Sequence, residues 1–210
     1  MNLIEIINWR YSTKALKGKI VPEEKMNAIL KATLLCPTSS GLHPFHIILI
    51  GDKQLKKKML PIIHNQPVVE QSSHLTVFTT WYSYTPERIN QHFSYLNKQR
   101  NMPDSTTDDF RKMILLSFEK QTPLEHFNHA LKQSNIGLGF ALIAAANEKV
   151  EFTPKEGFTP DALDELLELK KQGMKTTATL ALGYSDEKTS GLVKLKKGRE
   201  PMSEYVTVNE

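Results

Sequence analysis

Residues 176–183 read TTATLALG, and this stretch predicts a strand because β-branched residues favour extended backbone and Gly183 ends the run. Two earlier stretches have a similar character. His74–Trp81, HLTVFTTW, predicts a second strand, and Phe45–Ile50, FHIILI, predicts a short buried strand closed by a glycine. A further strand is expected near the C-terminus over Glu204–Val208, EYVTV. Strands are therefore expected from the first quarter of the chain to its end.

The helix expected directly before residues 176–183 carries both a start and a stop signal. Thr159 can cap its N-terminus, Pro160 fits its first position, and Gly173 ends it. Acidic side chains in the first turns and basic ones in the last complement the helix dipole, namely Asp161 and Asp164, then Lys170 and Lys171. Leucines at helical spacing predict its buried stripe: Leu163, Leu166 and Leu167.

Other helices are expected on both sides of these strands. Three apolar residues at helical spacing predict a helix over residues 2–9, and another is expected from Pro22 until shortly before Pro37. The lysines at 53–58 predict a solvated helix, and residues 86–130 are expected to be mostly helical with breaks at prolines.

Residues 136–146 are apolar nearly all round, so a helix buried on several sides is expected there. Its small residues, including Gly137 and Gly139, allow close backbone approach. Because helices and strands mix along one predicted domain, residues 1–210, the class is α/β or α+β.

Composition restricts the function classes before any motif is considered. The 210 residues carry 27 Lys and Arg against 23 Asp and Glu, a net charge of +4 and a pI near 9.0, with one Cys. A chain of this length buries a core without disulfides, no apolar run approaches the ~18 residues of a membrane span, and the acidic start is unlike a signal peptide. A soluble cytoplasmic protein is expected. The positive charge is compatible with nucleic acid, an anionic ligand or surface lysines alone.

The histidine pair and the cysteine are weak candidates for chemistry. His126 and His129 lie about one turn apart on a predicted helix, but nothing completes a metal pattern, so two surface histidines and no metal are expected. Cys36 could pair with a distant histidine as a nucleophile, although a free cysteine is more typical of a small buried hydrophobe.

Four loop segments are stronger candidates when they are taken together. Alternation along an extended segment puts two cations and a hydroxyl on one side, where they suit an anion: Arg10, Ser12 and Lys14. Residues 37–41 form a hydroxyl-rich turn, residues 154–158 present backbone N–H groups before a capped helix, and residues 196–201 are basic. Alone, each segment is more typical of an ordinary polar loop or solvated face.

In this order and spacing, the segments resemble the flavin mononucleotide (FMN) nitroreductase family, in particular its oxygen-insensitive NAD(P)H nitroreductase and dihydropteridine reductase group. RYSTK at 10–14 resembles the family's R-[HY]-S-x-K, and PTSSGLHPFHI at 37–47 resembles P-S-S-x-N-x-Q-P-W-x-[FI]. NQPVVEQSSHLTVF at 65–78, PKEGF at 154–158 and KKGREP at 196–201 resemble further family motifs. The resemblance covers essentially the whole chain.

The resemblance implies a phosphate site built from both ends of the chain. Its members are Arg10, Ser12, Lys197 and Arg199, with Tyr11 also among the FMN-binding residues. Bidentate arginines and additional donors suit a phosphate dianion, so the implied roles agree with the physical character of these side chains.

The resemblance also implies residues at the flavin ring and in the partner subunit. Lys14 and Asn65 are expected at the pyrimidine edge, where an ammonium favours the anion left by two-electron reduction. Backbone N–H groups are expected at the edge that handles the hydride, from the loop Pro154, Lys155, Glu156 and Gly157. Lys14 and Glu156 are the expected catalytic residues. Three residues are expected to reach the flavin from the other subunit: Pro37, Thr38 and Ser39.

The implied fold is α+β, with a central, mostly antiparallel sheet flanked by helices and a C-terminal strand that crosses to the partner of a homodimer. The implied function is an FMN-dependent NAD(P)H oxidoreductase that reduces nitroaromatics or quinones by two-electron ping-pong hydride transfer. Two alternatives stay open: a flavin-dependent dehydrogenase or dihydropteridine reductase acting on a specific metabolite, and a non-enzymatic nucleic-acid-binding protein. The basic segment near residue 197 lacks the interleaved aromatics typical of the last class.

The chain departs from the family pattern at three positions. Gly41 and His43 replace the polar residues of N-x-Q-P-W, and Val68 stands where a lysine often follows the asparagine by three positions. One cation fewer is therefore expected near the ring edge, with a flavin somewhat harder to reduce. The expected substrate-lining segment near 113–118 matches poorly, so the acceptor is not identified.

Overall fold

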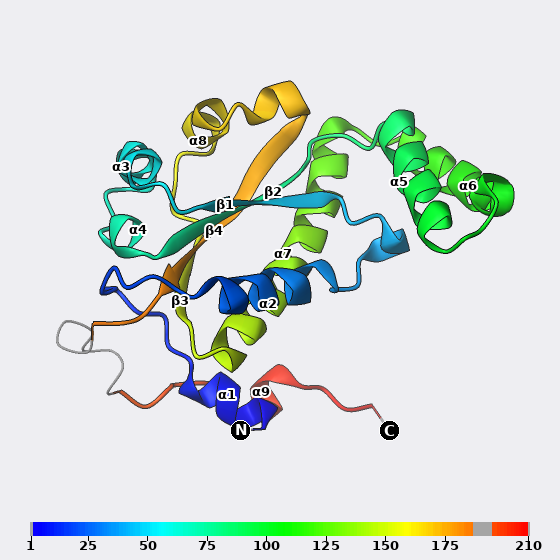
Figure 1. The fold of residues 1–210 in the computed structure, drawn as a ribbon. Coiled ribbons are helices and arrows are strands. Elements are labelled where there is room, and N and C mark those ends of the chain that lie inside the picture. The colour runs from blue at the N-terminus through cyan, green and yellow to red at the C-terminus, as the bar shows by residue number, and fades with distance from the viewer. Residues whose placement is uncertain (1, 187–194, 210) are drawn as a thin grey trace.

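The computed structural model describes residues 2–186 and 195–209. Within them, the central element is a four-stranded antiparallel sheet in the order β1–β2–β4–β3 (Figure 1). The strands are β1 Phe45–Ile50, β2 His74–Trp81, β3 Glu151–Lys155 and β4 Met174–Gly183. Because all three strand pairings are antiparallel, the α+β class expected from the resemblance is confirmed.

Helices cover both faces of this sheet (Figure 1). One face carries α1 Leu3–Trp9, α2 Glu23–Leu34 and α7 Pro123–Asn147. The other carries α3 Lys53–Ile62, α4 Val68–Gln71 and α8 Pro160–Leu166. Beyond the sheet project α5 Pro86–Gln99 and α6 Asp108–Glu119, joined by the 3-10 turn η2 Asp104–Thr107. The short elements are η1 Ser39–Gly41, η3 Leu169–Gln172 and α9 Met202–Tyr205. No helix in the described part of the chain is long and apolar enough to span a membrane.

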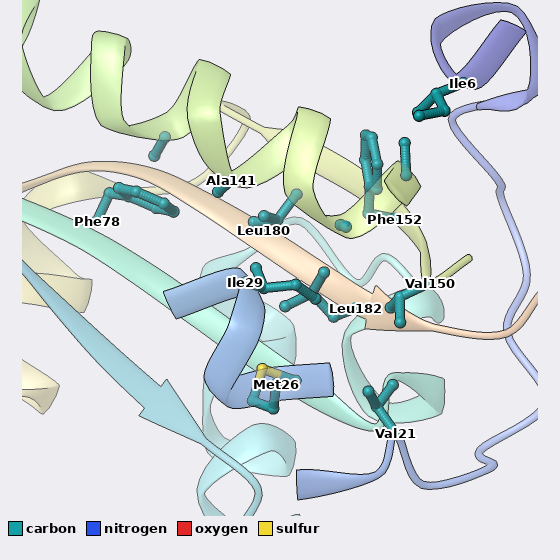
Figure 2. Packing of buried hydrophobic residues seen from close by; sticks show 13 residues of the cluster. Ile6, Val21, Met26, Ile29, Phe78, Ala141, Val150, Phe152, Leu180 and Leu182 are labelled. Carbon is teal, nitrogen blue, oxygen red and sulfur yellow. The ribbon is translucent and has the colours of Figure 1, made fainter. Parts of the chain in front are cut away.

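Strand β4 separates two hydrophobic cores because its side chains alternate between the faces. Leu180 and Leu182 pack with residues of α2 and α7, among them Ile29 and Ala141 (Figure 2). Ala181 faces the opposite core, formed with α3, α4 and α8. The sheet therefore lies between two helical layers.

The predicted strands β1 and β2 have the expected bounds, and β4 begins two residues earlier than expected. The expectation that β1 is buried is wrong, since only Ile50 in it is buried and the strand lies at a sheet edge. Strand β3 was not predicted. It includes Pro154, and it accommodates a proline because it is the other edge strand.

The helix expected over residues 159–173 is interrupted. Helix α8 ends at Leu166, and Glu168 has a left-handed φ of 53° before η3 begins. The break allows Leu163 and Leu169 both to be fully buried, whereas a continuous helix would turn them about 120° apart. Asp164 does not complement the helix dipole at the surface: it is 0% exposed and accepts a hydrogen bond from the Thr176 N–H at 2.8 Å.

The other predicted helices form, with two corrections. The helix at 53–58 is not fully solvated, because Lys56 is 2% exposed. On α7, Gly137 does permit close approach, since a Cβ there would lie 2.8 Å from the Phe45 ring, whereas Gly139 faces open space. The expected burial of residues 136–146 on several sides is confirmed for Gly137, Ala141, Ala145 and Ala146, while one stripe is 39–43% exposed, namely Ile136, Phe140 and Ile143.

Three further expectations concern residues away from the sheet. His126 is a buried side chain and not a surface one, since its Nδ1 accepts the Tyr84 N–H and its Nε2 lies 2.9 Å from the Phe118 carbonyl oxygen. Cys36 is buried, as expected. The strand expected over Glu204–Val208 is wrong for the single chain, where α9 forms one helical turn and residues 206–209 pair with no strand among the described residues.

Candidate functional site

The segment after α1 runs beside the edge strand β3. Ser12 forms a parallel bridge with Phe152, and the Thr153 hydroxyl donates to the Thr13 carbonyl oxygen. Thr13 points into the protein, and the neighbouring Arg10 guanidinium donates to the Ser12 Oγ at 3.1 Å. The pairing of Arg10 with Ser12 on one side of an extended segment is the arrangement that alternation predicts.

Residues near the C-terminus return to this segment. The Lys197 ammonium donates to the carbonyl oxygens of Ile7 and Asn8 in the last turn of α1, at 2.5 and 2.8 Å. It also lies 4.9 Å from the centre of the Tyr11 ring, and the Tyr11 hydroxyl donates to the Leu195 carbonyl oxygen. Side chains almost 190 residues apart in the sequence are thus brought together.

Three cations converge here, Arg10, Lys197 and Arg199, which we call the cation cluster. The pKa of Arg10 is lowered mainly by burial and to a smaller extent by the charge of Arg199. The pKa of Lys197 is likewise lowered mainly by burial, with smaller contributions from the charges of Arg10 and Arg199. Among the described residues, none of the three forms an ion pair with a carboxylate. Like charges held together without a counterion repel one another, and a bound anion would relieve this repulsion.

A second group of cations lies at the end of β3. Lys155, the last residue of the strand, is 7% exposed and donates to the Gln66 Oε1. Burial, and then the charge of the exposed Lys14, lowers the pKa of Lys155 to about 8. We call Lys14 and Lys155 the lysine pair. A Cβ on Gly157 would lie 3.6 Å from both Gln66 and His64, so the loop after β3 contacts this turn.

Comparison with known proteins shows the family of the chain. A family model described as the nitroreductase family matches residues 7–184. The chain belongs to the nitroreductase family. The matched region contains the lysine pair and Arg10 but ends before Lys197 and Arg199. Membership confirms both the family expected from the motifs and the oxidoreductase class.

Individual relatives extend the likeness to nearly the whole chain. The major NAD(P)H-flavin oxidoreductase of Aliivibrio fischeri is 24% identical over 98% of both chains. The oxygen-insensitive NADPH nitroreductase of Helicobacter acinonychis is 24% identical over 97% of this chain and 94% of its own. A nitroreductase from Exiguobacterium sibiricum, solved in complex with FMN, superposes with a TM-score of 0.86 at 18% identity, covering 100% of this chain and 98% of the other. The nitroreductase fold is therefore confirmed.

The donor set of this nitroreductase-family chain fits FMN at both ends. The cation cluster and the Ser12 hydroxyl provide charged and neutral donors for a phosphate. At the other end, the N–H groups of Glu156 and Gly157 have no acceptor among the described residues, although the Glu156 carbonyl accepts the Phe158 N–H at 3.1 Å. Free backbone donors beside a lysine pair suit the polar edge of a flavin ring.

The turn at Asn65 has the shape expected of a ligand-facing residue. Asn65 is exposed, with a left-handed φ of 52°, and its N–H donates to the Leu60 carbonyl oxygen at 2.9 Å. The same turn carries Gln66, which the sequence did not single out as a site residue. Its place inside the NQP motif was the signal that could have identified it.

Residues Pro37, Thr38 and Ser39 are not brought to the cation cluster within one chain. They follow α2 on the side of α5, whereas α1 and β3 lie toward the opposite end of α2 (Figure 1). Local bonds hold the loop: the Thr38 Oγ1 accepts the His43 N–H, and the Ser39 N–H donates to the Gln133 Oε1. A site that contains both groups requires two copies of the chain.

A cavity of about 880 Å³ lies in the helical projection. It is lined by residues of α5, α6 and the start of α7, including Leu115, Leu116 and Phe118. These residues belong to the segment in which a substrate-lining helix is expected, but none of the predicted FMN-binding residues lines the cavity.

Proposed function

We propose that this chain is an FMN-dependent NAD(P)H oxidoreductase that passes two electrons to a small acceptor such as a nitroaromatic or a quinone. The observation that carries the proposal is the cation cluster. Arg10, Lys197 and Arg199 come from opposite ends of the chain and form no ion pair with a carboxylate of the described residues, which suits a phosphate dianion.

The residues divide the work between the two ends of the cofactor. The cation cluster and Ser12 would hold the phosphate, while the backbone N–H groups of Glu156 and Gly157 would fix the ring edge. The lysine pair would place positive charge beside the ring. When bound, FMN supplies the redox chemistry, taking a hydride from NADPH or NADH and giving two electrons to the acceptor. A ping-pong order, with donor and acceptor using the same space in turn, needs no acidic side chain.

The active unit in this proposal is a homodimer. Phe140 and Ile143, from the exposed stripe on α7, line a groove of about 380 Å³ between α1, α2 and α7. Apolar surface of this kind favours a protein partner. A second copy that covers it would also allow the partner's Thr38 and Ser39 to reach this site, and the C-terminal segment after α9 to pair across the interface.

We also propose that residues 1–210 form one domain and that the protein is cytoplasmic. The names of the relatives support the donor and the cofactor: the Aliivibrio fischeri protein is an NAD(P)H-flavin oxidoreductase, and the Helicobacter acinonychis protein is an NADPH nitroreductase.

The direct test is purification and cofactor analysis. The protein should be yellow, with a flavin absorption spectrum and about one FMN per chain, and anaerobic NADPH or NADH should bleach it. A nitroaromatic or quinone should then restore the colour. A colourless protein that takes up no added FMN would contradict the proposal, whereas bleaching only by a saturated metabolite would indicate a dehydrogenase.

A further inference from the structure

Lys155 is a buried lysine whose charge is not compensated by protein groups. Its ammonium is held by the Gln66 amide oxygen, and the charge that acts on it is another ammonium, Lys14. Burying an ammonium is costly unless an opposite charge or several acceptors replace water. The described residues around Lys155 do not supply a carboxylate that raises its pKa.

Lys56 shows how this fold compensates a buried lysine elsewhere. Its ammonium, 2% exposed, donates to the backbone carbonyl oxygens of Ser72 and Ser73. Burial lowers the pKa of Lys56, but the carboxylates of Asp52 and Glu70 partly oppose that shift. Lys56 is therefore a structural lysine, whereas no carboxylate of the described residues compensates Lys155, which lies near the ammonium of Lys14.

Position 68, at the start of α4, does not supply a positive charge to the turn at Asn65. Val68 begins α4 and is buried in the core with Met59 and Leu75, so this position carries no cation. The turn at Asn65, three residues before Val68, instead contacts a cation from β3, because the Gln66 side chain accepts a hydrogen bond from the Lys155 ammonium. The loop with the free N–H groups of Glu156 and Gly157 follows directly.

We propose that Lys155 replaces, from strand β3, the cation that position 68 lacks, and that Lys14 and Lys155 together stabilise the negative charge of reduced FMN. The proposal rests on the proposed function. Transfer of a hydride from NAD(P)H to FMN releases NAD(P)⁺ and leaves one negative charge on the reduced ring, and this charge faces two ammonium groups.

The test measures the two-electron midpoint potential of FMN in the purified holoenzyme at pH 7. In the Lys155→Met variant, the affinity for reduced FMN should fall about tenfold relative to that for oxidised FMN, which corresponds to a potential about 30 mV lower. Lys155→Gln keeps a donor near Gln66 but removes the charge, so the same shift is expected. Lys56→Met, which removes an equally buried lysine away from the site, should leave the potential unchanged.

The outcomes separate the two proposals. Potentials of the Met and Gln variants equal to that of the wild type would overturn the role of Lys155 while leaving the proposed function intact. A shift in Lys155→Met but not in Lys155→Gln would indicate a structural role and also overturn it. A wild-type protein that binds no FMN would overturn the proposed function itself. Variants that lose FMN during purification are measured with FMN added to saturation.

Discussion

Replacing both Arg10 and Arg199 with alanine should weaken FMN binding by about a thousandfold. Each guanidinium would make charged hydrogen bonds to the phosphate, and each such bond contributes about 1.5–3 kcal/mol, so two together give about 4 kcal/mol. The variant should still fold, because removing two cations from the cation cluster relieves repulsion with Lys197. Titration of the apoprotein, followed by flavin fluorescence, measures the affinity.

In the single variant Arg199→Ala, the affinity for FMN should fall by about tenfold or more, while turnover at saturating FMN should change less. Lys171→Ala is a suitable control, because it removes an exposed cation that already pairs with Glu168 and is not part of the cation cluster. The control should bind FMN as the wild type does. An unchanged affinity in the double variant would rule out the phosphate role of the cation cluster.

Placing a charge on α7 should separate the two subunits and abolish FMN binding. Phe140 is 39% exposed in the single chain and borders the groove between α1, α2 and α7. In Phe140→Glu, association would bury a carboxylate without a partner, which costs several kcal/mol. The dissociation constant of the proposed dimer should therefore rise by at least about a hundredfold. Light scattering after size-exclusion chromatography measures the mass, and the absorption spectrum measures bound FMN.

Ile20→Glu provides the matched control for this experiment. Ile20 is 63% exposed and lines a different pocket beside α3, so the same charge change should leave both the mass and the bound FMN unaltered. A wild-type protein that is monomeric yet binds FMN would contradict the two-copy site. Persistence of the dimer in Phe140→Glu would place the interface on another surface.

Local signals predicted most of the fold. The bounds of β1 and β2 follow from β-rich runs between turn residues, and capping signals identified the start of α8. The break at Glu168 could not be predicted, because it depends on the burial of both Leu163 and Leu169, which tertiary packing decides. Strand β3 was missed since its proline is tolerated only at a sheet edge, and edge position is a property of the whole sheet.

The sequence singled out most residues that the candidate site contains, although not Gln66, but it did not predict the contacts between them. Alternation placed Arg10 beside Ser12, yet no spacing in the sequence indicates that Lys197 caps α1 near Arg10. The sequence predicted a role only for the backbone around Lys155. The burial of its side chain and its contact with Gln66 depend on the approach of two distant segments. The same limit applies to His126, which helical spacing alone assigned to the surface.

Comparing FMN with riboflavin tests the central claim most directly, since the two ligands share the ring and differ in the phosphate. Titration of the wild-type apoprotein should show FMN binding at least about a hundredfold tighter than riboflavin, and the Arg10→Ala, Arg199→Ala double variant should lose most of that preference. Equal affinities of the wild-type protein for FMN and riboflavin would contradict the assignment of the cation cluster to the phosphate.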